Sequence, residues 1–184
     1  MHGAPADERV EYDHERGFTL MDLMVVTLII GVLIAIAVPA FLGAKSRAQA
    51  KSAQSSLGNA ATTSKVIYTD AASYLTANVA ALTKAEPGLG FVATRTASTG
   101  PRRVSVNPVS PAAGGTAIIM TALTASRVCY VIGTWSTGGT FFAKLATGAS
   151  CSATQATTTL RTVRPNPPAT SNTAGTTGAW VRSW

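Results

Sequence analysis

Histidine and acidic residues are scarce in this chain. Both histidines fall within the first 17 residues, and only three acids lie beyond residue 17: Asp22, Asp70 and Glu86. With two cysteines as the remaining ligand candidates, the spacing needed for a metal cluster is missing. No glycine-rich loop precedes a Lys-Ser or Lys-Thr pair that would hold a phosphate. We therefore expect no enzyme, no metal site and no cofactor.

Because acids are scarce, positive charge dominates the chain. The formal net charge is +7, and the first 17 residues carry two basic residues against five acids (2 − 5 = −3), so the remainder carries +10. Such a balance favours contact with anionic surfaces. The basic residues are spread from Lys45 to Arg182, only Arg102 and Arg103 are adjacent, and no nucleic-acid-binding motif occurs. Contact with DNA is therefore a minor alternative to attraction by an acidic cell envelope.

One long apolar run is the clearest feature that is present. Leu23 to Ala44 contains 22 residues without a charge, and as a helix it would span about 33 Å, the thickness of a bilayer core. A secretory signal peptide has a shorter apolar stretch, followed by a small-residue cleavage site. Here the run is longer, no such site follows it, and the Gly17–Phe18 junction precedes it.

The string GFTLMDLMVVTLIIGVLIAIAVPAFLGA, which starts at Gly17, resembles the type IV prepilin family. The resemblance covers about Arg16 to Lys51. It implies that prepilin peptidase cuts between Gly17 and Phe18 and removes residues 1–17 as a leader, that Phe18 becomes N-methylated, and that the retained helix forms a filament core. The implied partners are identical subunits, the peptidase, the pilus assembly machinery and, before assembly, the membrane. The implied location is the inner membrane for the precursor and the cell surface for the filament.

Asp22 is the candidate assembly residue. An ionised carboxylate inside a bilayer is costly, so it should have a partner. The candidate partner is the amino group of Phe18 after cleavage, on the same chain or a neighbour. The family usually has Glu at this position, so the shorter Asp22 keeps a minor pilin or a secretion pseudopilin open as an alternative. Another interpretation leaves Asp22 solvated at the headgroup level, without a role.

We predict an α+β fold in which one long helix, from about Leu20 to Thr69, packs on a small antiparallel sheet, as in the pilin fold. Residues 18–44 form the membrane or filament-core half, and residues 45–70 form an amphipathic half. A stripe of small and apolar residues recurs on one face of the second half at intervals of three and four: Ala50, Ala53, Leu57, Ala60, Ser64 and Ile67. Gly31 and Pro39 weaken the first half and predict a bend, which the resemblance associates with local melting on assembly.

The head is expected to span residues 71–153. After a loop with Asp70 and Tyr74 and a short helical turn over 78–84, β-branched and aromatic runs separated by turn residues predict five strands. The predicted strands are 90–96, 103–106, 117–123, 128–135 and 140–145. A Thr/Pro-rich tail over 154–184 is expected to be loosely structured or extended. Within it, Trp180 and Trp184 are expected to dock on the head in preference to serving an external partner.

The two cysteines bear on the orientation of the chain. An even count in an exported head predicts a Cys129–Cys151 disulfide, with two free buried thiols as the alternative. The basic residues just after the span, Lys45, Arg47 and Lys51, oppose export by the positive-inside rule. We favour export because long domains translocate regardless of flanking charge. A single-pass envelope protein that never polymerises remains the alternative from another class.

Overall fold

A computed structural model describes residues 18–111, 114–146, 150–160 and 180–184. The chain divides into two compact units, residues 1–42 and 43–184, which we describe separately. Helix α1 (Leu20–Ala71) begins in the first unit and continues into the second. The helix is continuous through Gly31 and Pro39, so the local melting associated with assembly stays a prediction.

The second unit contains a five-stranded sheet in the order β1-β2-β3-β4-β5. Its strands are β1 (Gly90–Val92), β2 (Arg103–Val109), β3 (Ala117–Leu123), β4 (Val128–Trp135) and β5 (Gly139–Ala146). The pairs β2–β3, β3–β4 and β4–β5 are antiparallel, as predicted. The prediction of a wholly antiparallel sheet is wrong for β1, which pairs parallel to β2. The reason is the connection between them, which returns the chain to place Arg103 beside Gly90 at the start of both strands.

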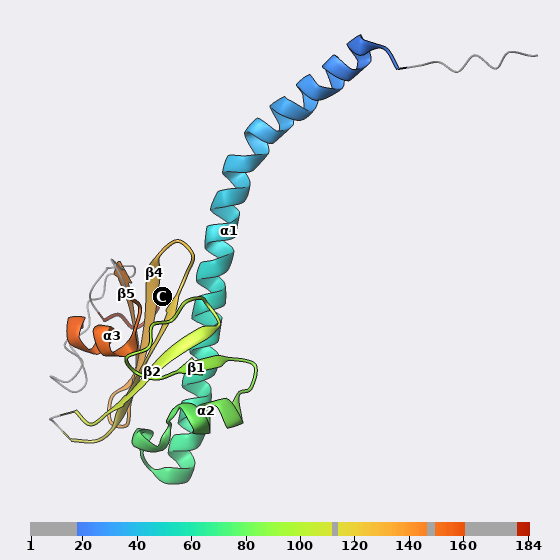
Figure 1. The fold of residues 1–184 in the computed structure, drawn as a ribbon. Helices are drawn as coiled ribbons and strands as arrows, with labels where there is room; N and C mark the ends of the chain where they lie inside the picture. The colour runs from blue at the N-terminus through green and yellow to red at the C-terminus, as the bar shows by residue number, and fades with distance from the viewer. Residues whose placement is uncertain (1–17, 112–113, 147–149, 161–179) are drawn as a thin grey trace, which may run out of the picture. The chain divides into compact units, whose positions relative to one another are not determined.

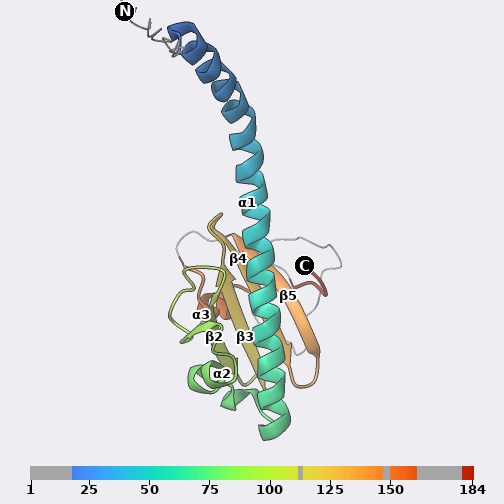
Figure 2. The same ribbon diagram turned by 90° about the vertical axis from the view of Figure 1, so that its right-hand side faces the viewer.

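The second half of α1 packs on one face of the sheet (Figures 1 and 2). The predicted stripe makes this contact, since Ala53, Leu57 and Ala60 are fully buried. They share a core with every second residue of β3, namely Ile118, Met120 and Ala122. Because side chains alternate across a strand, the intervening residues of β3 point to the opposite face. The predicted α+β architecture, a long helix on a sheet, is therefore the fold of this protein.

A second core covers the opposite face of the sheet, and it includes a helix that the sequence analysis missed. Helix α3 (Ala153–Thr159) lies on the side of the sheet away from α1 (Figure 1). Its cap residue Ser152 accepts a hydrogen bond from the backbone N–H of Gln155 at 3.2 Å. Ala156 and Leu160 then bury their side chains against the sheet. The predicted loose tail therefore begins with an ordered helix, and its residues 161–179 lie outside the described residues.

The last described segment, residues 180–184, pairs with the free edge of β5 at one position. The Phe142 N–H donates to the Val181 carbonyl at 2.9 Å, and the Val181 N–H donates to the Phe142 carbonyl at 2.7 Å. Trp180 packs in the core on the α3 side. Trp184 packs against the core on the α1 side, with its ring 5.0 Å from those of Tyr130 and Phe142. The predicted docking of both tryptophans is confirmed. One packs on each face of the sheet, beside β5.

Helix α1 ends two residues later than predicted, so Asp70 lies in its last turn and not in a loop. The helix stops because Ala72 adopts a left-handed backbone with φ of 52°. Its N–H bonds to the Tyr68 carbonyl at 2.7 Å. The chain then enters a 3₁₀ turn, η1 (Tyr74–Thr76), and the short helix α2 (Val79–Ala85), which Asn78 caps.

Changing Ala72 to glycine is expected to stabilise the head by about 1 kcal/mol, because glycine adopts a left-handed backbone without the steric cost that alanine bears. The matched control is Ala71→Gly, one residue earlier and still helical, which should lose about 1 kcal/mol. Chemical denaturation of the detergent-solubilised chain measures both. Equal destabilisation by the two changes would contradict the assignment of Ala72 as the helix terminator.

Candidate functional site

The first half of α1 exposes apolar side chains on all its sides. Every large apolar residue from Phe18 to Leu42 is exposed, with fractions from 46% at Val26 to 84% at Phe18. This part of the helix is long and apolar enough to cross a membrane, and none of its most apolar stretch is buried within the protein. An apolar surface of this extent is stable only in lipid or against other protein.

Asp22 and Thr19 form a reciprocal cap at the start of α1. The Asp22 Oδ2 atom accepts hydrogen bonds from the Thr19 N–H at 3.1 Å and from the Thr19 hydroxyl at 2.8 Å. The Thr19 hydroxyl oxygen in turn accepts from the Asp22 N–H at 3.2 Å. This arrangement satisfies backbone donors that no helical carbonyl reaches and places a negative charge at the positive end of the helix. The sequence analysis missed this capping role, although Thr-x-x-Asp is close to the capping-box pattern.

The capping geometry bears on the proposed pairing of Asp22 with the amino group of Phe18. In the uncut chain that nitrogen belongs to the peptide bond after Gly17, so the pair can form only after cleavage. Gly17 and the leader lie outside the described residues, and cleavage, methylation and pairing stay predictions. The cap orders the helix start, and Phe18 sits next to it with an exposed side chain.

A shallow groove of about 490 Å³ runs along this half of α1. It is lined by Met24, Thr27, Leu28, Gly31, Val32 and Ala35. The absence of a side chain at Gly31 produces the groove, and a Cβ added there would meet nothing within 4 Å. Thr27, Gly31 and Ala35 recur every four residues, the spacing that lets two helices approach closely in a membrane. The groove therefore suits the packing of a second helix.

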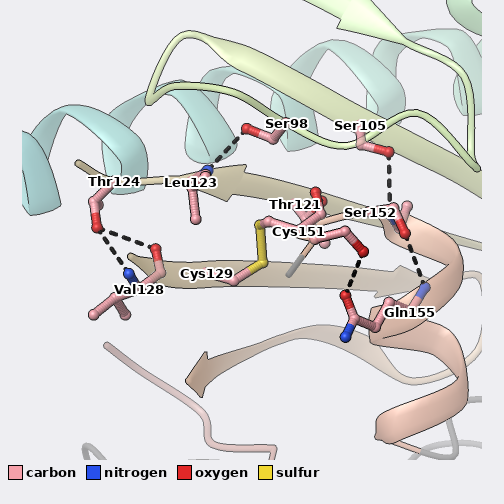
Figure 3. The surroundings of a disulfide bond; sticks show 12 residues. Ser98, Ser105, Thr121, Leu123, Thr124, Val128, Cys129, Cys151, Ser152 and Gln155 are labelled. Carbon is pink, nitrogen blue, oxygen red and sulfur yellow. Dashed lines mark hydrogen bonds between the residues drawn. A yellow bond between two sulfur atoms is a disulfide. The ribbon is translucent and has the colours of Figure 1, made fainter. Parts of the chain in front are cut away.

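The structure joins Cys129 and Cys151 in a disulfide, with their Cα atoms 5.6 Å apart (Figure 3). Both residues are buried, and the bond ties β4 to the segment before α3. The Cys151 carbonyl also accepts hydrogen bonds from the Thr121 hydroxyl at 3.1 Å and from the Ser98 N–H at 2.9 Å. The disulfide therefore contributes to the stability of the head.

Two tyrosines of the head have raised pKa values. Burial raises the pKa of the Tyr74 phenol above its ordinary value of 10.0, and the neighbouring Tyr68 raises it further. Burial also raises the pKa of Tyr130. Both phenols therefore stay neutral at physiological pH and add no negative charge to a basic head.

A cleft of about 530 Å³ beside β1 is lined by Arg102, Arg103 and mostly apolar or small residues, without a carboxylate. Within the described residues, no group of three or more His, Cys, Asp or Glu side chains could hold a metal ion. No family model, curated protein or solved structure matches the chain.

Proposed function

We propose that this chain is a structural subunit of an extracellular filament of the type IV pilus kind. In this proposal prepilin peptidase removes residues 1–17, Phe18 becomes the methylated amino terminus, and the first half of α1 leaves the membrane to pack against identical helices. The sheet and the second half of α1 form the outer surface. A repeated contact between different surfaces of identical subunits builds an open helical polymer.

The exposed first half of α1 carries this proposal. A plain membrane anchor needs only length and hydrophobicity, whereas this helix adds a groove at Gly31 and a charge at Asp22. The head has its own two cores and a disulfide, so it does not need the apolar helix half to fold. That half is therefore available to exchange lipid for other copies.

A minor pilin or a secretion pseudopilin is the second candidate, favoured by one observation. The carboxylate at position 22 is one methylene shorter than the glutamate usual in the family, so it reaches less far towards a neighbour. A subunit present in few copies tolerates a weaker contact of this kind. Electron microscopy of sheared surface material, with mass spectrometry of its main protein, distinguishes a major from a minor subunit.

The proposal is tested by the amino terminus and by the variant Asp22→Ala. Sequencing of the purified protein should begin at methylated Phe18, and Asp22→Ala should insert and be cut normally while its filament yield falls about tenfold or more, since an unpaired amine is left in an apolar bundle. Thr19→Val is the matched control, because it removes both hydrogen bonds of the Thr19 hydroxyl from the cap but keeps the charge. It should assemble nearly as well as the original.

Two results would contradict this proposal. Recovery of uncut Met1, or of an amino terminus other than Phe18, would favour a simple membrane anchor. Equal filament yields from Asp22→Ala and the original chain would reject the pairing of Asp22 with the amino group.

A further inference from the structure

Asp70 occupies a position that its own chain does not explain. It is exposed in the last turn of α1, and that turn contains no basic residue. A carboxylate there faces the partial negative charge of the helix carbonyls, which is unfavourable. Asp70 forms no hydrogen bond or ion pair with any residue that the structure describes, although basic residues greatly outnumber acids in this chain. A charge that opposes the local rules without compensation points to a contact outside the chain.

Lys45 presents the complementary charge on the same side of the same helix. It too is exposed, and it lacks an ion pair or hydrogen bond across the described ranges. Lys45 and Asp70 are 25 positions apart (70 − 45), which corresponds to about 6.9 helical turns and an axial distance of about 38 Å. Their side chains therefore leave α1 within about 20° of each other around its axis. The other nearby bases, Arg47 and Lys51, are turned away from this line by about 100° or more.

The helix surface between these two charges carries no other charge. The positions that face the same way recur at intervals of three or four residues: Ala48, Ser52, Ser55, Asn59, Thr63 and Val66. The middle of this line forms one wall of a cleft of about 340 Å³, whose opposite wall includes Glu86, Gly88 and Arg102. A neighbouring helix would meet short, uncharged side chains of α1 along this line, a charge at each end, and Glu86 and Arg102 of the head beside its middle.

We propose that Asp70 of one copy forms an ion pair with Lys45 of a second copy that lies alongside, parallel, displaced by about 38 Å along α1 and turned by about 180° around the helix axis, so that the two side chains face each other. This inference rests on the proposed function, since a filament supplies parallel, axially displaced copies. Each copy then offers Asp70 to one neighbour and Lys45 to another, so the contact repeats without closing. The pair fixes the axial register of the subunits along the second half of α1.

A charge swap in the full-length chain tests the pair. The variants are expressed in a host with prepilin peptidase and a pilus assembly system, and sheared filaments are measured against total cut subunit. Asp70→Lys and Lys45→Asp should each lower the filament yield about tenfold or more, because each places like charges opposite one another. The double swap restores an opposite pair and should return the yield to within about threefold of the original. Lys65→Asp, the same charge change on another side of α1, is the matched control and should assemble normally.

Cross-linking gives a second measurement. The described cysteines are already paired with each other, so Lys45→Cys combined with Asp70→Cys adds two reactive thiols. A short bis-maleimide should link them between copies and yield a ladder of multimers from intact filaments. Either single cysteine should give no ladder beyond dimers.

The possible failures separate the two proposals. If the original chain is cut but never forms filaments, the proposed function is wrong. If the original assembles and both single reversals assemble equally well, or the double swap fails to recover while the control assembles, the Asp70–Lys45 pair is wrong and the filament proposal stands.

Discussion

Replacement of Gly133 by alanine is expected to lower the free energy of unfolding of the head by about 1–3 kcal/mol, since added volume in a packed core forces neighbouring groups apart. Gly133 lies in β4, beneath two tryptophan rings. A Cβ built on it would lie 2.5 Å from Trp135 and 2.8 Å from Trp180. The two rings meet edge to face with centroids 5.2 Å apart. Trp135 lies in the same strand and Trp180 in the last described segment, so the added methyl group meets rings from both.

Gly58→Ala is the matched control for this change. Gly58 is an exposed glycine within α1, and an added Cβ would meet nothing within 4 Å. Alanine is the better helix former, so the same methyl group should stabilise the head there by about 1 kcal/mol. Near-ultraviolet circular dichroism and tryptophan fluorescence follow both variants in detergent, because all the tryptophans of the chain lie in the head. Loss of the same stability at both glycines would contradict the account of Gly133.

Trp180→Ala extends the test to the C-terminal residues. Removal of a buried tryptophan should cost about 3–5 kcal/mol. The double variant with Gly133→Ala should cost less than the sum of the two single variants, because the space vacated by Trp180 relieves part of the clash. If the losses of unfolding free energy were additive, the clash between the added methyl group and Trp180 would not be the cause of the Gly133→Ala effect.

The regular spacing of apolar residues allowed most of the fold to be predicted from the sequence. The stripe from Ala50 to Ile67 identified the face of α1 that packs on the sheet, and the bounds predicted for β3 and β4 match the structure. These elements are buried and strongly patterned, so local sequence and tertiary packing agree. The direction of β1 could not be predicted, since three residues carry no pairing signal and the return path of the following loop decides it.

Helix α3 was missed for a different reason. Its residues are mostly threonine and alanine, a composition that averages to a loose tail. The local signal was present, however: Ser152 and Gln155 have the spacing of a capping box, and Ala156 and Leu160 follow at helical intervals. At the candidate site, the sequence identified Asp22 because an ionised carboxylate inside a bilayer is costly. The Thr-x-x-Asp spacing from Thr19 to Asp22 is close to a capping box, but the choice between a cap and a distant partner depends on geometry that the sequence does not give.

The second large effect is expected from the disulfide. Loss of the Cys129–Cys151 bond, which closes a sequence separation of 22 residues, should destabilise the head by roughly 3 kcal/mol on the chain-entropy model. The segment around Cys151 keeps other contacts, since Ser105 accepts a hydrogen bond from the Ala153 N–H at 3.1 Å (Figure 3). The reduced head should therefore remain folded at low temperature and melt about 10 °C or more below the oxidised head.

Single and double alanine variants distinguish the stability that the disulfide bond provides from the stability that burial of the two side chains provides. If the bond provides the stability, Cys129→Ala alone removes all of it, and adding Cys151→Ala should change the free energy of unfolding by less than about 1 kcal/mol. If the two residues acted only as buried apolar groups, each truncation would leave its own small cavity and the costs would add. Reductant should destabilise the original chain and leave both variants unaffected. Additive costs together with indifference to reductant would show that the head does not depend on the cross-link.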